Sequence, residues 1–171
     1  MPFNINKHTY MEKLFQSTMS LIEKLLMIIF ILLVVDVSWQ VFSRFVIGQS
    51  SSFTEELARF ALIWLTVLGA AYLNGKQAHL SISVFLQKLS PEKQRARKII
   101  IELFMLIFAL IIMVIGGINL VYITLHLGQT SSALQVPLGL VYSIVPLSGC
   151  FIIFFSLYHI LTLRTLSNSP S

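Results

Sequence analysis

The stretch SSFTEELARFALIWLTVLGAAYLNG, residues 51–75, decides the fold of this chain. Its Ser52 and Glu55 have the S-x-x-E spacing of a capping box, which predicts a helix that begins at Phe53, and the final Asn-Gly is a typical helix end. The 22 residues from Phe53 to Asn74 would form a helix about 33 Å long, close to the apolar thickness of a bilayer. This stretch therefore predicts a membrane-spanning helix.

Three charged residues lie in the first turns of this predicted helix. Glu55 and Glu56 precede Arg59 by four and three positions, so all three side chains can meet on one side of the helix, near one membrane face. One interpretation is a solvated helix start with an ordinary ion pair, which the helix dipole favours. The other interpretation is a functional cluster, so we treat the three residues as candidate site residues.

The composition of the whole chain is that of an integral membrane protein. Hydrophobic residues make up 56% of the 171 residues and charged residues 11%, and the mean hydropathy is +0.84. The apolar runs do not alternate as barrel strands do, which excludes a transmembrane barrel. The sequence predicts an all-α integral membrane fold, a single membrane domain over 1–171, with four transmembrane helices at about 25–47, 53–74, 99–123 and 138–163.

The basic residues predict the orientation of the helices. Ten of the 12 Lys and Arg fall on one side of the predicted membrane, and the positive-inside rule therefore places both termini and the central loop in the cytoplasm. This distribution also accounts for the net charge of +5 without a nucleic-acid partner. The ten residues are Lys7, Lys13, Lys24, Lys76, Lys88, Lys93, Arg95, Arg97, Lys98 and Arg164.

The first predicted span carries polar residues on one face. Asp36, Gln40 and Arg44 follow each other at helical spacing, and an ionised carboxylate at this depth is costly, so Asp36 needs a partner or a proton. If the first two spans form an antiparallel hairpin, facing residues have numbers that sum to about 100. Arg44 then lies level with the two glutamates and Asp36 close to Arg59. We interpret the set as a structural clamp, with a proton or ion route as the alternative.

Other segments have simpler interpretations. Residues 1–20 are expected to be a loose or surface-lying cytoplasmic lead-in, and the apolar spacing in 81–89 predicts a short amphipathic helix on anionic membrane lipids. Trp64 and Trp39 are interpreted as packing or interface aromatics. Glu102 is expected to pair with a neighbouring basic residue, Arg95, Arg97 or Lys98. Histidine, cysteine and nucleophile patterns predict no enzyme and no cofactor.

At WQVFSRFVIG, FTEELARFALIWLTVLGAAYLNGKQAH and GQTSSALQVPLGLVYSIVPLSG the chain resembles the small membrane subunit of tripartite ATP-independent periplasmic (TRAP) transporters, the DctQ type. The resemblance covers nearly all of 24–163. One departure is the turn NGKQAH, where the family often has an arginine-rich turn. The matching positions are Arg44, Glu55, Glu56, Arg59, Trp64, Gly69, His79, Pro137, Tyr142 and Pro146.

The resemblance implies a scaffold role in the bacterial inner membrane. It implies a large multi-helix permease subunit as partner, a periplasmic substrate-binding protein that docks on the complex, and a sodium gradient that drives uptake of an organic acid such as sialic acid or a C4-dicarboxylate. Overall similarity favours sialic acid. Two alternatives from the residues stay open: a stand-alone proton-coupled four-helix exporter that depends on Asp36, and a haem or quinone membrane anchor of a respiratory enzyme.

Overall fold

The computed structural model describes residues 5–48, 51–76 and 91–165, and nearly all of these are helical. Four helical rods cross the length of the molecule, and each is long and apolar enough to span a membrane, so the predicted four-span α fold is confirmed. The elements in chain order are α1 (Ile5–Phe42), the π-helix η1 (Ser43–Ile47), α2 (Ser52–Gly75), α4 (Pro91–Phe108), the π-helix η2 (Ala109–Gly116), α5 (Gly117–His126), α6 (Leu138–Tyr142) and α7 (Ile144–Thr165).

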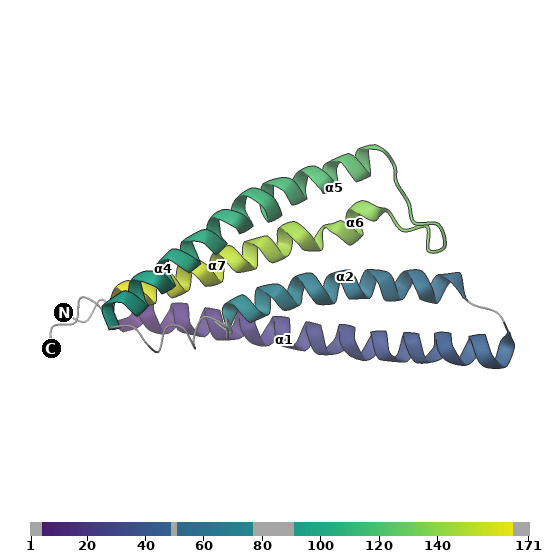
Figure 1. The fold of residues 1–171 in the computed structure, drawn as a ribbon, viewed down its shortest axis with the longest axis horizontal. Helices are drawn as coiled ribbons and strands as arrows, with labels where there is room; N and C mark the ends of the chain where they lie inside the picture. Colours follow the sequence, from purple (N-terminus) through teal and green to yellow (C-terminus); the bar gives the residue numbers. More distant parts are fainter. Residues whose placement is uncertain (1–4, 49–50, 77–90, 166–171) are drawn as a thin grey trace.

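The rods form two hairpins (Figure 1). The first consists of α1 and α2, and the second pairs the continuous rod α4-η2-α5 with α6 and α7. The beginning of α1 and the end of α7 lie together at one end of the molecule, which we call the terminal end. At the opposite end, the loop end, lie the turn after η1 and the loop of residues 127–137. The two hairpins come together at the terminal end and separate toward the loop end.

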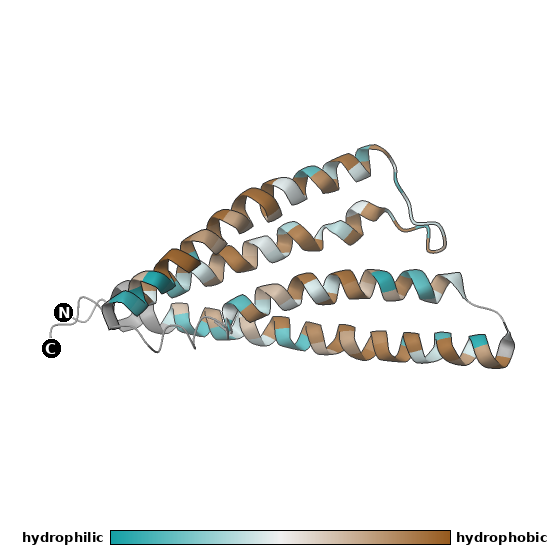
Figure 2. Cartoon of the chain, viewed as in Figure 1, coloured by the Kyte–Doolittle hydropathy of each residue, from teal (hydrophilic) through white to brown (hydrophobic). Residues whose placement is uncertain are grey.

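The surface of the helices is apolar along most of their length. Figure 2 shows hydrophobic residues over the middle of the rods, with hydrophilic residues gathered at the terminal end and in the part of α2 nearest the loop end. Large apolar side chains such as Phe104, Ile111 and Ile115 are well exposed. Because lipid is as apolar as these side chains, such a surface is stable only in a membrane or against another membrane subunit.

The first helix begins much earlier than the sequence analysis expected. Residues 5–20 form the first turns of α1, so the prediction of a loose lead-in is wrong. Met19 and Ile22 are buried with Phe155 of α7, and the ring of Phe15 stacks on Tyr158 with a centroid distance of 4.3 Å. Apolar residues at spacings of four and three thus bind the start of α1 to the second hairpin.

Two glycines allow the rods of the second hairpin to approach closely. A Cβ added at Gly149 would lie 2.8 Å from the Cβ of Met113 in η2, and one added at Gly117 would lie 2.9 Å from the Cδ of Pro146. At Gly116 the nearest atom to such a Cβ is the carbonyl oxygen of Ile111, at 3.7 Å. Of the adjacent residues Gly116 and Gly117, therefore, only Gly117 touches the neighbouring helix.

The bounds of the helices in the structure can be compared with those of the four predicted spans. The candidate spans are Tyr10–Val46, Ser52–Gly75, Lys93–His126 and Leu138–Leu163, so each contains or closely matches a predicted one. The third is longer than a bilayer core requires. The predicted interfacial helix at 81–89 and the candidate residue His79 lie outside the described residues.

Candidate functional site

Glu56 fastens α2 to the loop that joins the two rods of the second hairpin. Its Oε2 accepts hydrogen bonds from the backbone N–H groups of Ala133, at 2.9 Å, and Leu134, at 2.8 Å, and its Oε1 accepts one from Ser132 at 3.1 Å. Successive N–H groups that converge in this way form a concave anion site. The carboxylate of Glu56 therefore ties the first hairpin to the second at the loop end.

The loop is folded to present these donors. The N–H of Ser131 donates to the carbonyl of Val136 at 2.9 Å, and the N–H of Val136 donates to the Ser131 hydroxyl at 3.2 Å. Gln135 turns the chain back with φ 56°, a value that few residues other than glycine adopt. Sequence reasoning placed Glu56 beside Arg44 and missed this contact, because backbone donors 76 to 78 positions away leave no side-chain pattern to find.

Glu55 and Arg59 form the ion pair that their spacing predicts. The Nη2 of Arg59 lies 3.2 Å from the Oε1 of Glu55, and the two side chains are 65% and 58% exposed. A pair this exposed contributes little to stability because water and salt screen it. At these two residues the structure agrees with the ordinary i,i+4 interpretation.

Arg44 does not join the cluster, because the register of the first hairpin differs from the expected one. Met19 packs against Gly75, and Asp36 lines the same groove as Ala58, so facing residues have numbers that sum to about 94 rather than 100. Arg44 therefore lies level with position 50, before α2 begins. Its side chain is exposed on η1 and, within the described residues, forms no ion pair.

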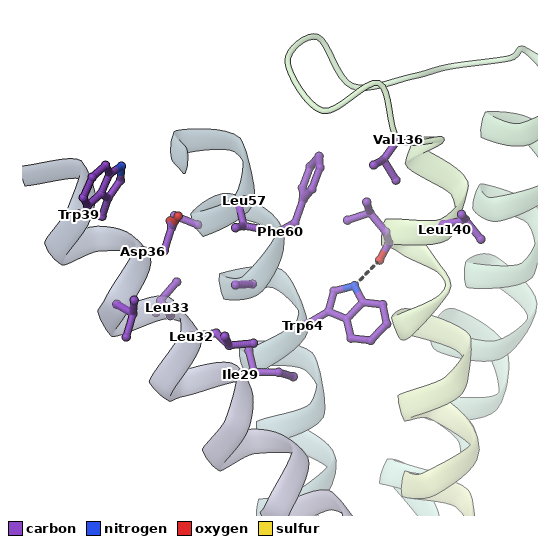
Figure 3. A pocket seen from close by; sticks show the side chains of 14 residues that line it. Ile29, Leu32, Leu33, Asp36, Trp39, Leu57, Phe60, Trp64, Val136 and Leu140 are labelled. Atoms are coloured by element: carbon purple, nitrogen blue, oxygen red, sulfur yellow. Dashed lines mark hydrogen bonds between the residues drawn. The ribbon is translucent and has the colours of Figure 1, made fainter. Parts of the chain in front are cut away.

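Asp36 faces the groove between the hairpins instead of a basic partner (Figure 3). One of its carboxylate oxygens, Oδ2, is enclosed and has no hydrogen-bond partner among the described residues. Arg59 is close to the same level of the hairpin but is turned away and engaged with Glu55. The single compensated network of five charges expected from the sequence is thus divided into separate parts.

Trp64 connects α2 to α6. Its indole Nε1 donates a hydrogen bond to the carbonyl oxygen of Val141 at 3.0 Å (Figure 3). This carbonyl belongs to the last turn of α6, where helical carbonyls lack partners within the helix. Trp64 is therefore an interhelical donor as well as a packing aromatic, the role that sequence analysis gave it.

Gly69 is half-buried, and a Cβ added there would meet no atom within 4 Å. The chain itself therefore gives no close helix approach at this position.

A second polar contact, which sequence reasoning missed, lies near the terminal end. The Nδ1 of His159 in α7 is 3.1 Å from the Oε1 of Glu102 in α4, and the two side chains are only 7% and 5% exposed. Arg95, an expected partner of Glu102, instead donates to the backbone carbonyl of Leu163. The sequence signal was slight: a single histidine inside the last predicted span.

Replacing Glu56 with glutamine should release the loop at 132–134. A neutral amide offers one acceptor oxygen in place of a charged carboxylate with two, so backbone N–H groups of the loop lose their partner. We expect these amides to exchange with deuterium about tenfold faster or more, because local opening becomes easier. Glu55→Gln removes the same charge one residue away without touching the loop and is the control. Equal exchange in both variants would contradict the assignment.

Comparison with known proteins identifies the family. Residues 33–166 match the family described as tripartite ATP-independent periplasmic transporters, DctQ component. This range contains every candidate site residue of the sequence analysis, from Asp36 to His79. The match extends over more than three quarters of the chain and includes most residues of the groove, the loop held by Glu56 and the Glu102–His159 contact.

Three curated relatives agree with this match. The chain is 31% identical over 109 residues to a provisionally named TRAP transporter small permease protein of Haemophilus influenzae, covering 64% of this chain and 66% of that one. It is 29% identical over 134 residues to the sialic acid TRAP transporter small permease protein SiaQ of Vibrio cholerae, covering 75% and 73%. A third similarity, 27% identity over 101 residues, is to the isethionate TRAP transporter permease protein DctMQ of Oleidesulfovibrio alaskensis and covers 59% and 16%.

The matched region thus spans about two thirds of the length of the first relative and a small part of the last. The family is a component of transporters and not an enzyme. Its relatives and the four helices able to span a membrane place the chain in the bacterial inner membrane as a multi-pass protein. The chain belongs to the DctQ component family of the tripartite ATP-independent periplasmic transporters.

Proposed function

We propose that this chain is the small scaffold subunit of a sodium-driven TRAP transporter and that it holds a large permease subunit in place. In the relative named DctMQ, a segment similar to this chain makes up only 16% of a longer chain, so that protein joins such a segment covalently to a much larger part. The extensive apolar surface of the helices suits a position against another membrane subunit.

The scaffold assignment rests on what the polar side chains of the helices contact. In the described part of the chain, polar side chains fasten elements to one another, among them Glu56 with the loop, Trp64 with Val141, Asn74 with Ser156, and Glu102 with His159. A transport route would instead need polar groups that line a path across the membrane. The groove that contains Asp36 is almost wholly apolar and gives no such lining.

The cargo is proposed to be an organic acid, delivered by a periplasmic binding protein. One relative is named for sialic acid and another for isethionate, so relatives of this chain serve different acids. Similarity over three quarters of the chain to the first of these two supports sialic acid, with a C4-dicarboxylate as the other candidate. We further propose that both termini face the cytoplasm, since the basic residues gather at the terminal end.

Reconstitution in vesicles tests this proposal. The tagged chain, co-expressed with a large TRAP permease subunit, should retain that subunit through mild-detergent purification. Uptake of labelled acid should require both membrane subunits, the binding protein and an inward sodium gradient. In this assembly Glu56→Ala should lower the yield of complex and the uptake in proportion, because the loop loses its anchor, while the sodium dependence of the remaining uptake keeps its shape.

The exporter alternative predicts a different result. The chain alone would then move substrate in response to a proton gradient, and Asp36→Asn would abolish this transport. Proton-driven transport by the chain alone, or an altered sodium dependence in Glu56→Ala, would contradict the scaffold assignment.

A further inference from the structure

An open groove of about 530 Å³ lies between α1, α2 and α6 (Figure 3). Its walls are aliphatic and aromatic side chains, including Leu33, Leu57, Phe60 and Leu140. Asp36 is the charged residue among the residues that line it. A hollow of this size and apolar character is typical of a ligand site.

Contacts between the hairpins close the groove at both ends. On the side of the terminal end, the hydrogen bond from Trp64 to Val141 joins α2 and α6, and beyond it Leu68 and Ile144 are buried where α2 packs on α7. On the side of the loop end, Val136 belongs to the loop that Glu56 holds. The groove is therefore a lateral hollow, and no helix can run through it along the direction of the rods.

The length of the groove suits an acyl chain. The lining residues of α1, from Ile29 to Trp39, cover about 15 Å of that helix at 1.5 Å per residue. A flexible hydrocarbon chain can enter from the side and lie along the apolar wall.

Asp36 sets the chemistry of the polar end of the ligand. Its Oδ2 is enclosed without a hydrogen-bond partner among the described residues, and a buried acceptor of this kind is costly unless a donor reaches the carboxylate. Asp36 lies level with Ala58 of α2, within one turn of the exposed ion pair of Glu55 and Arg59. It therefore lies at the boundary between the charged first turns of α2 and the apolar middle of the helices. The indole of Trp39, half-exposed beside it, is the kind of side chain that lies at headgroup depth.

We propose that the groove binds a phospholipid with a primary amine headgroup, phosphatidylethanolamine, with its ammonium on the carboxylate of Asp36 and one acyl chain along the apolar wall. The ammonium supplies N–H donors and a positive charge to the carboxylate. Phosphatidylglycerol carries a net negative charge that Asp36 repels, and the trimethylammonium of phosphatidylcholine has no N–H to donate. The site thus selects one lipid by charge and by hydrogen bonding.

Tryptophan fluorescence reports directly on this groove. The chain has two tryptophans, and both line it. The full chain in detergent micelles is titrated with phosphatidylethanolamine, phosphatidylglycerol or phosphatidylcholine, each brominated on its acyl chains so that bound lipid quenches the emission. We expect the ethanolamine lipid to quench the emission saturably. The other two lipids should need at least about tenfold higher mole fractions to reach half of the maximal quenching. Asp36→Asn should weaken the binding of the ethanolamine lipid about tenfold, strengthen that of phosphatidylglycerol because the repulsion is gone, and leave that of phosphatidylcholine unchanged.

A matched pair of variants on α2 gives the second measurement. Ala61→Phe fills the groove and should abolish the saturable quenching, whereas Leu62→Phe, on the exposed face one residue away, should leave it intact. Equal quenching by all three lipids, or unchanged quenching in Ala61→Phe, overturns the proposal. Loss of the saturable quenching when the permease subunit is added also overturns it, because the occupant is then a segment of that subunit.

Discussion

His159→Ala should lower the free energy of unfolding by about 3–5 kcal/mol, the cost found when one partner of a buried pair is removed. The side chains of His159 and Glu102 are 7% and 5% exposed, and the Oε2 of Glu102 already lacks a partner. Without the imidazole both carboxylate oxygens stay buried and unpaired. Thermal denaturation of the purified full chain, followed by the loss of helical signal, measures the effect.

Two further variants separate the contact from the packing of the ring, which also lies 5.7 Å from the ring centroid of Phe15. His159→Asn keeps an N–H donor near the position of Nδ1 and should recover part of the loss. The double variant Glu102→Ala with His159→Ala should be more stable than His159→Ala alone, because it no longer buries an unpaired carboxyl group. If the double variant loses the sum of both single effects, the two side chains do not act as a pair.

Gly149→Leu should be the second strongly destabilising change, by about 3 kcal/mol, because added atoms enter a filled interface between α7 and η2. Even a Cβ at this position would lie 2.8 Å from the Cβ of Met113 and 3.3 Å from the backbone nitrogen of Val114. Backbone cannot move aside as a long side chain can, so the rods must separate. Denaturation of the full chain gives the size of the effect, and cysteine cross-linking between the rods detects the separation.

Gly116 supplies the matched control. A Cβ added there meets only the carbonyl oxygen of Ile111, at 3.7 Å. Gly116→Ala should therefore stabilise the helix by up to about 1 kcal/mol, the difference in helix propensity, whereas Gly149→Ala should destabilise it. Both variants gain the same helix propensity, so opposite changes in stability would report the close approach of α7 and η2 alone. A gain of stability in both variants would mean that α7 and η2 are not in tight contact.

Hydropathy predicted the four spans because each apolar run is longer than a bilayer core is thick. The start of α1 was not predicted, because Lys7 and Lys13 make the segment look polar. The apolar side chains of Phe15, Met19 and Ile22 can be recognised as a packing face only when α7 is seen beside them. The ion pair between Glu55 and Arg59 was predictable because it is local. Helical spacing fixes such pairs without knowledge of the fold.

The rest of the candidate site depends on register and on backbone groups. Whether Arg44 reaches the glutamates depends on a shift of about six residues, roughly 9 Å along a helix, which helical spacing alone does not fix. Glu56 binds three backbone N–H groups, and any sequence provides those. Asp36 was recognised as needing a partner, but its place in an apolar groove follows from the separation of the two hairpins.

The hairpins are joined at three heights, by Asn74 with Ser156 near the terminal end, Trp64 with Val141 in the middle, and Glu56 with the loop at the far end. Two rods hinged at one point can swing freely, but rods braced at three separated points bend only if a brace yields. The separation of the hairpins also makes the molecule broader, and a broader braced frame resists bending more strongly than a compact bundle of the same helices. Stiffness in the membrane plane is thus a property of this subunit that its helices would not have if only their terminal ends were joined.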